Sequence, residues 1–318
     1  MGSFILKRIG ISFLVVFLIT TITFGLVRIL PGDPAVLVLG TEANEEDLQA
    51  VREEYNLDKP VITQYVLWVK GVLHGDFGKS IVFNRNISDL VSERLPVTVS
   101  LGAPALVIGA ALGILFGILS AVHRGKFIDQ VLTFFSTTGI GVPVFWVGIL
   151  LIYLLAMKLH LLPIQGYTRP SVNFAEYLRK AIMPIFCLSL SSIASVTRQT
   201  RSNMLEVINQ DYVRTARANG LPERSVIYRH AFRNALIPVI TIIAMRIRMV
   251  VGGSVLTEQL FNIPGIGTLL VSAVNGRDYS VIQTCVFLIS LVTVLFNLVV
   301  DILYGIIDPR IRLAKNGD

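Results

Sequence analysis

The sequence from Asp211 to Pro238, DYVRTARANGLPERSVIYRHAFRNALIP, is the longest polar, arginine-rich stretch that lies between two strongly apolar ones. We expect such a stretch to lie in water while both of its ends enter a membrane. Its pattern predicts a short helix over Tyr212–Asn219, a left-handed stop at Gly220 and a second helix that opens at Pro222.

On the first predicted helix, Tyr212, Ala216 and Asn219 share one face, and the small side chain of Ala216 would let another surface approach closely. Basic residues surround this face: Arg214, Arg217, Arg224, Arg229 and Arg233. A loop that only fixes the membrane topology would also be basic. Such a loop does not need a helix, a glycine, a proline and a second helix in this order, so the pattern favours a structured docking element.

The composition of the 318-residue chain indicates a membrane protein, with 53% apolar residues, only 15% charged residues and a mean hydropathy of +0.68. The net charge of +7 is also typical of nucleic-acid binding. The bases, however, lie in short loops between apolar runs, which is the positive-inside distribution. We therefore expect a lipid bilayer as the surroundings and no nucleic-acid partner.

Apolar runs that reach or approach the roughly 20 residues needed to cross a bilayer predict an all-α protein with six transmembrane helices. The runs are Ile9–Ile29, Val97–Val122, Val131–Met157, Leu178–Val196, Ala235–Leu256 and Val281–Ile307. Their flanking bases all fall on one side, so the N and C termini are predicted to be cytoplasmic. The first run is too long for a signal peptide and lacks its cleavage pattern, so we expect it to be retained.

This pattern divides the chain into an N-terminal tail with the first span (1–30), an extracytoplasmic segment (31–96) and a five-helix core (97–318). The core contains a cytoplasmic loop over 198–234. The extracytoplasmic segment predicts a helix capped by Asn44. It also predicts an amphipathic helix, either in a small folded cap or at the membrane interface with Tyr65 and Trp68 at headgroup level.

Small residues and prolines predict how the spans pack. Three glycines of the second span form a GxxxGxxxG face that favours close helix contact: Gly109, Gly113 and Gly117. Pro143 and Pro184 predict kinks in the third and fourth spans. Before the sixth span, Pro264 and neighbouring glycines break the backbone, and a short helix over 268–274 is predicted in a re-entrant or surface-lying piece.

Two arginines, Arg246 and Arg248, fall near the middle of the fifth span. A central arginine costs about 2.5–3.5 kcal/mol on insertion scales, so a function or a partner is expected. The two side chains project about 200° apart around a helix, so at most one faces a pathway. One hypothesis is that one of them attracts a substrate carboxylate. The alternative is a structural ion pair with Glu258 or Asp301.

No motif in the chain indicates catalysis or metal binding. There is no GxSxG, HExxH or Walker A pattern, the four histidines are scattered, and Cys187 and Cys285 lie in apolar runs. We therefore predict a non-enzymatic transport subunit with no catalytic residue, no metal and no cofactor of its own. ATP and magnesium would bind to partner chains.

The segment Asp211–Pro238 resembles the EAA loop of ABC-importer permeases. Arg214-Thr215-Ala216 stands where the family has Glu-Ala-Ala, Gly220 is kept and Arg233 replaces the usual proline. These departures resemble the peptide/nickel branch of the family. Other stretches are similar to the same branch: RILPGDPA (28–35), GDFGKS (75–80), LPVTV (95–99), LLPIQGY (161–167), FNIPGIG (261–267) and DPRIR (308–312).

The resemblance implies a B-type permease of a dipeptide, oligopeptide or nickel ABC importer in the bacterial inner membrane, with the type I importer bundle. It implies a second permease, two ATP-binding subunits and an extracytoplasmic substrate-binding protein as partners. The residues that it predicts to contact the ATPase are Tyr212, Ala216, Arg217, Gly220 and Leu221.

A stand-alone channel or secondary transporter is the alternative class. Inverted repeats and several membrane-embedded acids would support it, and neither is apparent. The sequence leaves the solute open among dipeptides, oligopeptides, nickel chelates, glutathione and similar ligands. Two arginines at mid-membrane disfavour a pathway for a bare metal cation.

Overall fold

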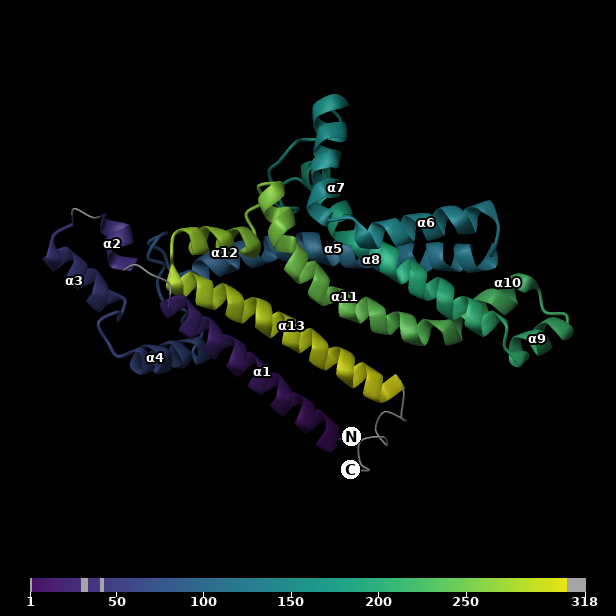
Figure 1. The fold of residues 1–318 in the computed structure, drawn as a ribbon, viewed down its shortest axis with the longest axis horizontal. Coiled ribbons are helices and arrows are strands. Elements are labelled where there is room, and N and C mark those ends of the chain that lie inside the picture. The colour runs from purple at the N-terminus through teal and green to yellow at the C-terminus, as the bar shows by residue number, and fades with distance from the viewer. Residues whose placement is uncertain (1, 30–33, 41–42, 308–318) are drawn as a thin grey trace. The chain divides into compact units, whose positions relative to one another are not determined.

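The computed structural model describes residues 2–29, 34–40 and 43–307, which contain helices and, apart from one isolated bridge between Lys79 and Asn86, no β-structure. The helices are α1 (Gly2–Ile29), α2 (Pro34–Leu39), α3 (Glu45–Glu54), α4 (Val61–Leu73), α5 (Ile87–Val122), α6 (Phe127–Gly141), α7 (Val144–Leu151), α8 (Phe174–Ile208), α9 (Asp211–Ala218), α10 (Glu223–Ser225), α11 (Phe232–Leu260), α12 (Ile266–Asn275) and α13 (Tyr279–Ile307), with π-helical turns η1 (Ile152–Lys158) and η2 (Val226–Ala231) (Figure 1).

The chain forms two compact units. Unit 1 is built around Ser100–Asn262, and unit 2 joins Lys7–Val99 to Ile263–Leu295. The segment that follows the first span therefore packs with α12 and the beginning of α13, which lie far away in the sequence.

Unit 2 confirms two predicted helices. Asn44 caps α3, because the backbone N–H of Asp47 donates to its side-chain oxygen at 2.7 Å. Helix α4 covers the predicted amphipathic stretch, and its aromatic face contacts protein: the Tyr65 ring lies 5.0 Å from that of Phe24, and the Trp68 ring 6.3 Å from that of Phe287. These contacts hold α4 against α1 and α13.

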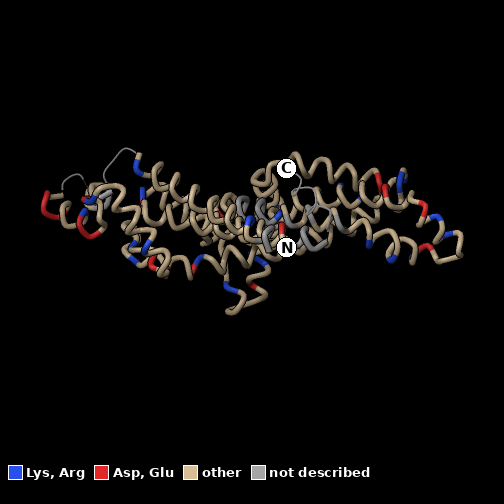
Figure 2. The backbone as a smooth tube through the Cα atoms, turned by 90° about the horizontal axis from the view of Figure 1, so that it is seen from below, with Lys and Arg blue, Asp and Glu red and all other residues tan. Residues whose placement is uncertain are grey.

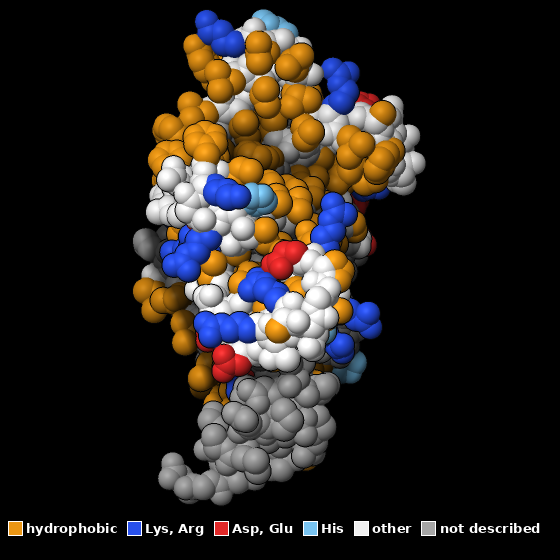
Figure 3. Space-filling model, turned by 90° about the vertical axis from the view of Figure 1, so that its right-hand side faces the viewer, with side chains coloured by type: hydrophobic (Ala, Val, Ile, Leu, Met, Phe, Trp, Pro, Cys, Tyr) orange, Lys and Arg blue, Asp and Glu red, His pale blue; other side chains and the backbone are white. Residues whose placement is uncertain are grey.

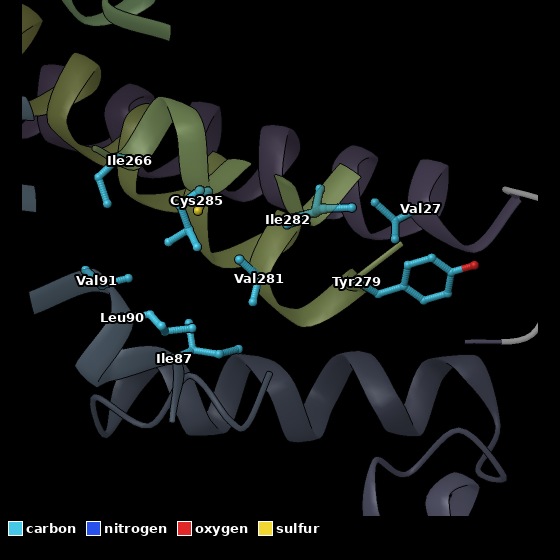
Figure 4. Packing of buried hydrophobic residues seen from close by; sticks show 11 residues of the cluster. Val27, Ile87, Leu90, Val91, Ile266, Tyr279, Val281, Ile282 and Cys285 are labelled. Carbon is cyan, nitrogen blue, oxygen red and sulfur yellow. The ribbon is translucent and has the colours of Figure 1, made fainter. Parts of the chain in front are cut away.

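The core of unit 2 is an apolar cluster to which four helices contribute. Figure 4 shows Val27 of α1, Leu90 of α5 and Ile266 of α12 with Val281 and neighbouring residues of α13 in one cluster. The predicted short helix before the sixth span is α12, and its buried side chains belong to this cluster.

A buried carboxylate joins the GDFGKS stretch to the beginning of α13. Asp278 is fully buried and accepts hydrogen bonds from the Ser80 hydroxyl at 2.6 Å and from the Val82 backbone N–H at 3.1 Å. Its second oxygen accepts from the Val281 N–H at 3.3 Å, in the first turn of α13. The carboxylate thus satisfies donors from two distant segments, which a buried charged group requires.

In unit 1 the predicted glycine face forms a close helix contact, and its partner is α8. A side-chain carbon added at Gly109 would lie 2.7 Å from Ser192, and one added at Gly113 would lie 2.5 Å from Val196. Gly117 approaches Thr200 in the same way. Since real carbon atoms do not approach so closely, α5 and α8 can pack at this distance only with glycine at these positions.

The third predicted span, 131–157, is not one straight helix. It is divided at Pro143 into α6 and α7–η1, whose axes differ by 109°. Proline cannot donate a backbone hydrogen bond, so the predicted kink is here a complete break. Pro184, in contrast, lies inside the continuous helix α8.

Among the described residues, four helices are long and apolar enough to cross a membrane, and the bent pair makes up to five. The four are Leu6–Ile29, Ile87–Val122, Phe174–Ile208 and Tyr279–Ile302. Helix α11 contains the predicted fifth span and has 29 residues, but many of its side chains lie outside the described residues, to which this set is limited. The six-span arrangement therefore stays a prediction.

Candidate functional site

The predicted docking element is a folded helical segment between α8 and α11, here called the coupling segment (211–231) (Figure 1). Helix α9 begins at Asp211, one residue before the predicted start. Gly220 has a φ of +76°, which confirms the left-handed stop. Pro222 then occupies the N-cap of α10, and η2 carries the chain into α11.

The inner face of the coupling segment closes an apolar cluster. Val213 of α9 and Val226 of η2 are fully buried, and they pack with Met204 of α8 and Ile118 of α5. Ala216 belongs to the same cluster and is only 7% exposed. Its small side chain lets α9 lie close to the rest of unit 1. A contact between Ala216 and an ATPase stays a prediction.

The outer face of the segment carries the other predicted contact residues. Tyr212 is 38% exposed and Leu221 is 40% exposed, and Arg217 and Gly220 are also exposed. The hydroxyl of Tyr212 accepts a hydrogen bond from the side-chain amide of Asn234 at 2.8 Å, which orients the ring. The outer face thus combines apolar and basic groups on a fixed backbone.

A salt bridge closes the turn around Gly220. Arg217 donates from two nitrogens to the Glu223 carboxylate, at 2.8 and 3.2 Å. The hydrogen bonds from Arg217 lower the pKa of Glu223, so the carboxylate stays ionised and the pair persists at neutral pH. Sequence reasoning missed this pair because it treated Arg217 only as a contact residue and gave Glu223 no role.

Charged residues concentrate at the end of unit 1 that carries α9 and α10 (Figure 2). On the face of the molecule shown in Figure 3, basic side chains are more abundant than acidic ones. The exposed arginines of the region are Arg214, Arg217, Arg224, Arg229 and Arg233. Such a surface suits a partner that presents acidic groups.

The buried position of Ala216 leads to a stability prediction. Leucine at position 216 adds three carbon atoms to a packed cluster, and we expect it to destabilise the coupling segment by about 1–3 kcal/mol. Ala218→Leu makes the same chemical change on the exposed side of α9 and should be nearly neutral. Hydrogen exchange over 211–231 measures both variants. Equal protection in the two would contradict the inward position of Ala216.

Arg246, one of the two arginines of the predicted substrate pathway, lies half-buried in α11. Within the described residues, the charged group that acts electrostatically on Arg246 is the exposed Arg198 of α8. A substrate role for Arg246 and a structural pair with Glu258 or Asp301 both stay predictions. The side chain of Arg248 lies outside the described residues.

No metal-binding arrangement is present in the described part of the chain, since no three His, Cys, Asp or Glu side chains gather there. Cys187 and Cys285 are both buried. The DPRIR stretch and residues 30–33 of the RILPGDPA stretch lie outside the described residues.

Comparisons with known proteins agree along the whole chain. The family model described as binding-protein-dependent transport system inner membrane component matches residues 113–313, and the model for the N-terminal part of such components matches residues 1–102. A probable peptide ABC transporter permease protein of Sinorhizobium fredii is 42% identical over 312 residues, which cover 98% of this chain and 100% of the relative.

Two further relatives also match over nearly the full length of both chains. An oligopeptide transport system permease protein of Bacillus subtilis is 39% identical over 98% of this chain and 100% of its own length. A dipeptide transport system permease protein of Escherichia coli is 36% identical over 99% of this chain and 100% of its own length.

The solved structures contain a similar fold. A chain of the MetNI methionine ABC transporter, in an inward-facing conformation, matches with a TM-score of 0.57 and 16% identity, over 69% of this chain and 96% of that chain. At this identity the likeness concerns the fold alone.

Proposed function

The chain belongs to the family of binding-protein-dependent transport system inner membrane components, and on this premise we propose that it forms, with a second permease, the translocation pathway of an ATP-driven peptide importer in the bacterial inner membrane. Six spans with both termini in the cytoplasm are part of this proposal. The names of three relatives, which refer to peptides, oligopeptides and dipeptides, support the solute class.

The coupling segment is the observation that carries the proposal. A loop that only fixes the membrane topology does not require an apolar core of its own. A segment that transmits force between two subunits must be rigid, and an apolar core supplies that rigidity. Val213, Ala216 and Val226 anchor it to α5 and α8. Tyr212, Arg217 and Leu221 stay available on the other side. A nucleotide-driven movement of the ATPase would then move α8 and α11 together with the segment.

In this mechanism the loaded substrate-binding protein docks outside, and ATP binding brings the two ATPase subunits together. The coupling segment follows its ATPase subunit, and the spans rearrange to expose the solute to the other side. Hydrolysis then resets the helices. Coupling of this kind requires that each ligand binds the two states of the permease with different affinity.

Leu221→Asp tests the coupling role. A charge in an apolar contact should remove the ATPase subunits from the purified complex and abolish ATP-dependent uptake, while the amount of chain in the membrane stays unchanged. Leu73→Asp makes the same change at an exposed position of α4 and should leave both properties intact. Mass spectrometry of the gently extracted complex counts the subunits.

If the chain with Leu221 intact came out of its native membrane alone or as a homo-oligomer, with no ATPase in several detergents, the importer proposal would fail. The stand-alone channel or secondary transporter would then be favoured. If Leu221→Asp retained the ATPase and uptake, only the contact role of Leu221 would be lost.

Arg246 with Arg198 is our candidate for recognition of the solute carboxylate. The like charges of Arg246 and Arg198 repel, and an anion that binds between them would relieve this repulsion. We expect Arg246→Gln to raise the KM for peptides with a free C-terminal carboxylate by about 10-fold or more, as for a lost charged hydrogen bond.

Uptake of the same peptides as C-terminal amides provides the internal comparison. The amide lacks the negative charge, so Arg246→Gln should leave its uptake unchanged. Arg124→Gln, at an exposed position in the turn before α6, serves as the control substitution. If Arg246→Gln reduced the uptake of peptide acids and of peptide amides equally, Arg246 would have a structural role.

A further inference from the structure

Unit 2 contains a pocket of about 320 Å³ that the transport role does not use. The outer part of α1, the helix α4, the loop after it and the first turns of α13 line this pocket. Its volume is at the lower end of the range of about 300–1,000 Å³ that is typical of sites for small molecules. All of its lining residues belong to unit 2.

Three residues that line the pocket each have one buried hydrogen-bond donor without a partner in the described structure. They are the Nη1 of Arg28, the indole Nε1 of Trp68 and the side-chain amide nitrogen of Gln283. Gln283 is only 4% exposed. An unsatisfied buried donor destabilises a folded protein, so three around one pocket indicate that a group rich in acceptor oxygens binds there.

The charge of Arg28 also indicates a ligand with acceptor oxygens. Its Nε and Nη2 both donate to the neutral side-chain oxygen of Gln64, at 3.0 and 2.6 Å, and its guanidinium lies 4.0 Å from the centre of the Phe24 ring. Within the described residues no carboxylate pairs with it. A partly buried guanidinium without a counter-ion favours an anionic ligand, and a phosphate accepts two parallel hydrogen bonds from arginine.

The pocket also contains acceptors on another part of its wall. Glu54 is neutralised by Lys79 at 2.9 Å, whereas Asp76 accepts only a backbone hydrogen bond from Gly78 at 2.9 Å through one of its oxygens. Among the described residues that line this pocket, Arg28 and the exposed Asp76 therefore each have no opposite charge paired with them. This combination fits a zwitterion that carries both a phosphate and an ammonium group.

Apolar side chains continue from the pocket along two helices. Leu67 lines the pocket and is 41% exposed, and Ile62 and Val66 of α4 are 79% and 58% exposed. Exposed aliphatic residues also follow one face of α1: Leu14, Leu18, Ile22 and Leu26. A polar pocket beside an apolar strip matches the headgroup and acyl chains of a membrane lipid.

We propose that this pocket binds the headgroup of phosphatidylethanolamine, with the phosphate at Arg28, Trp68 and Gln283 and the ammonium at Asp76. The bound lipid would hold α4 against α1 and α13. This role is independent of the transported solute and of the coupling segment.

The test uses the full chain, purified in detergent and stripped of lipid. Native mass spectrometry and thermal unfolding follow the addition of phosphatidylethanolamine, phosphatidylglycerol or phosphatidylcholine. We expect phosphatidylethanolamine to bind most tightly and to raise the Tm. Phosphatidylglycerol lacks the ammonium, and the quaternary ammonium of phosphatidylcholine cannot donate a hydrogen bond to Asp76.

Three variants each change one of the three donor residues. Arg28→Gln removes the charge and should weaken phosphatidylethanolamine binding by about 10-fold or more, as for a hydrogen bond to a charged group. Trp68→Phe keeps an aromatic ring and removes the indole N–H of a neutral donor, so a smaller loss is expected. Gln283→Met should weaken lipid binding while it raises the Tm of the lipid-free chain, because it removes an unsatisfied donor. Arg85→Gln, away from the pocket, is the control with the same change of charge.

Two results would overturn the proposal. One is equal retention of the three lipids by the unmodified chain and by all variants. The other is an increase of Tm by inorganic phosphate alone that is as large as that by the lipid, which would indicate a site for a free anion. The effect of Gln283→Met on the lipid-free chain keeps the test decisive if Arg28→Gln does not fold.

Discussion

Gly117→Leu is expected to prevent α5 from packing against α8 and to remove most of the folded protein from the membrane. A side-chain carbon at this position would overlap with Thr200 and would lie 2.8 Å from the backbone oxygen of Thr197. A backbone oxygen cannot rotate away as a flexible side chain can. Over-packing typically costs about 1–3 kcal/mol, and a whole leucine against a backbone should exceed this range.

The measurement is the amount of chain in the membrane together with its Tm in mild detergent. Gly25→Leu provides the matched control, because nothing lies within 4 Å of a carbon added at Gly25 of α1. We expect this control to be as abundant and as stable as the unmodified chain. If both variants were equally abundant and stable, this result would contradict the close contact between α5 and α8.

Asp129→Asn should have the second largest effect, because this carboxylate connects three helices. It accepts hydrogen bonds from Arg201 of α8 at 2.7 and 2.9 Å, from the Ser120 hydroxyl of α5 and from the Gly125 backbone N–H at 2.9 Å. Its side chain is 6% exposed. Asparagine cannot accept all of these bonds and leaves the arginine without a counter-ion.

Breaking a buried ion pair costs about 3–5 kcal/mol, and the 29% exposure of the Arg201 side chain favours the lower end of this range. Thermal unfolding in detergent measures the loss. Glu45→Gln breaks the exposed pair with Arg52, where the Glu45 side chain is 76% exposed, and should cost less than about 1 kcal/mol.

A double variant separates the ion pair from the packing. Asp129→Leu with Arg201→Met replaces both charges by apolar groups, so no charge stays buried alone, and part of the stability should return. A double variant that is less stable than Asp129→Asn would show that the hydrogen bonds of Ser120 and Gly125, rather than the ion pair, stabilise this junction.

Local rules predicted much of the fold correctly. The Asn44 cap, the left-handed Gly220, the break at Pro143 and the short helix α12 follow from the conformational limits of a few adjacent residues. The GxxxGxxxG face predicted a close contact, because small side chains at every fourth position lie on one side of a helix. The sequence did not say which helix would fill that face.

Other features depend on residues that are far apart in the chain. The buried position of Ala216 follows from the packing of α9 on α5 and α8, whereas helical spacing alone placed it on an accessible face with Tyr212. The hydrogen bond between Ser80 and Asp278 and the contact between Trp68 and Phe287 likewise required unit 2 to fold.

The sequence by itself determined the membrane class, the position of most helices, the cap at Asn44 and the stop at Gly220, and the family, because hydropathy, turn residues and motifs are properties of neighbouring residues. The tertiary structure decided which face of α9 is inside and which arginines lack an acidic partner in the described structure. Burial and charge pairing depend on what surrounds a side chain in space, and a helical period fixes only its direction on its own helix.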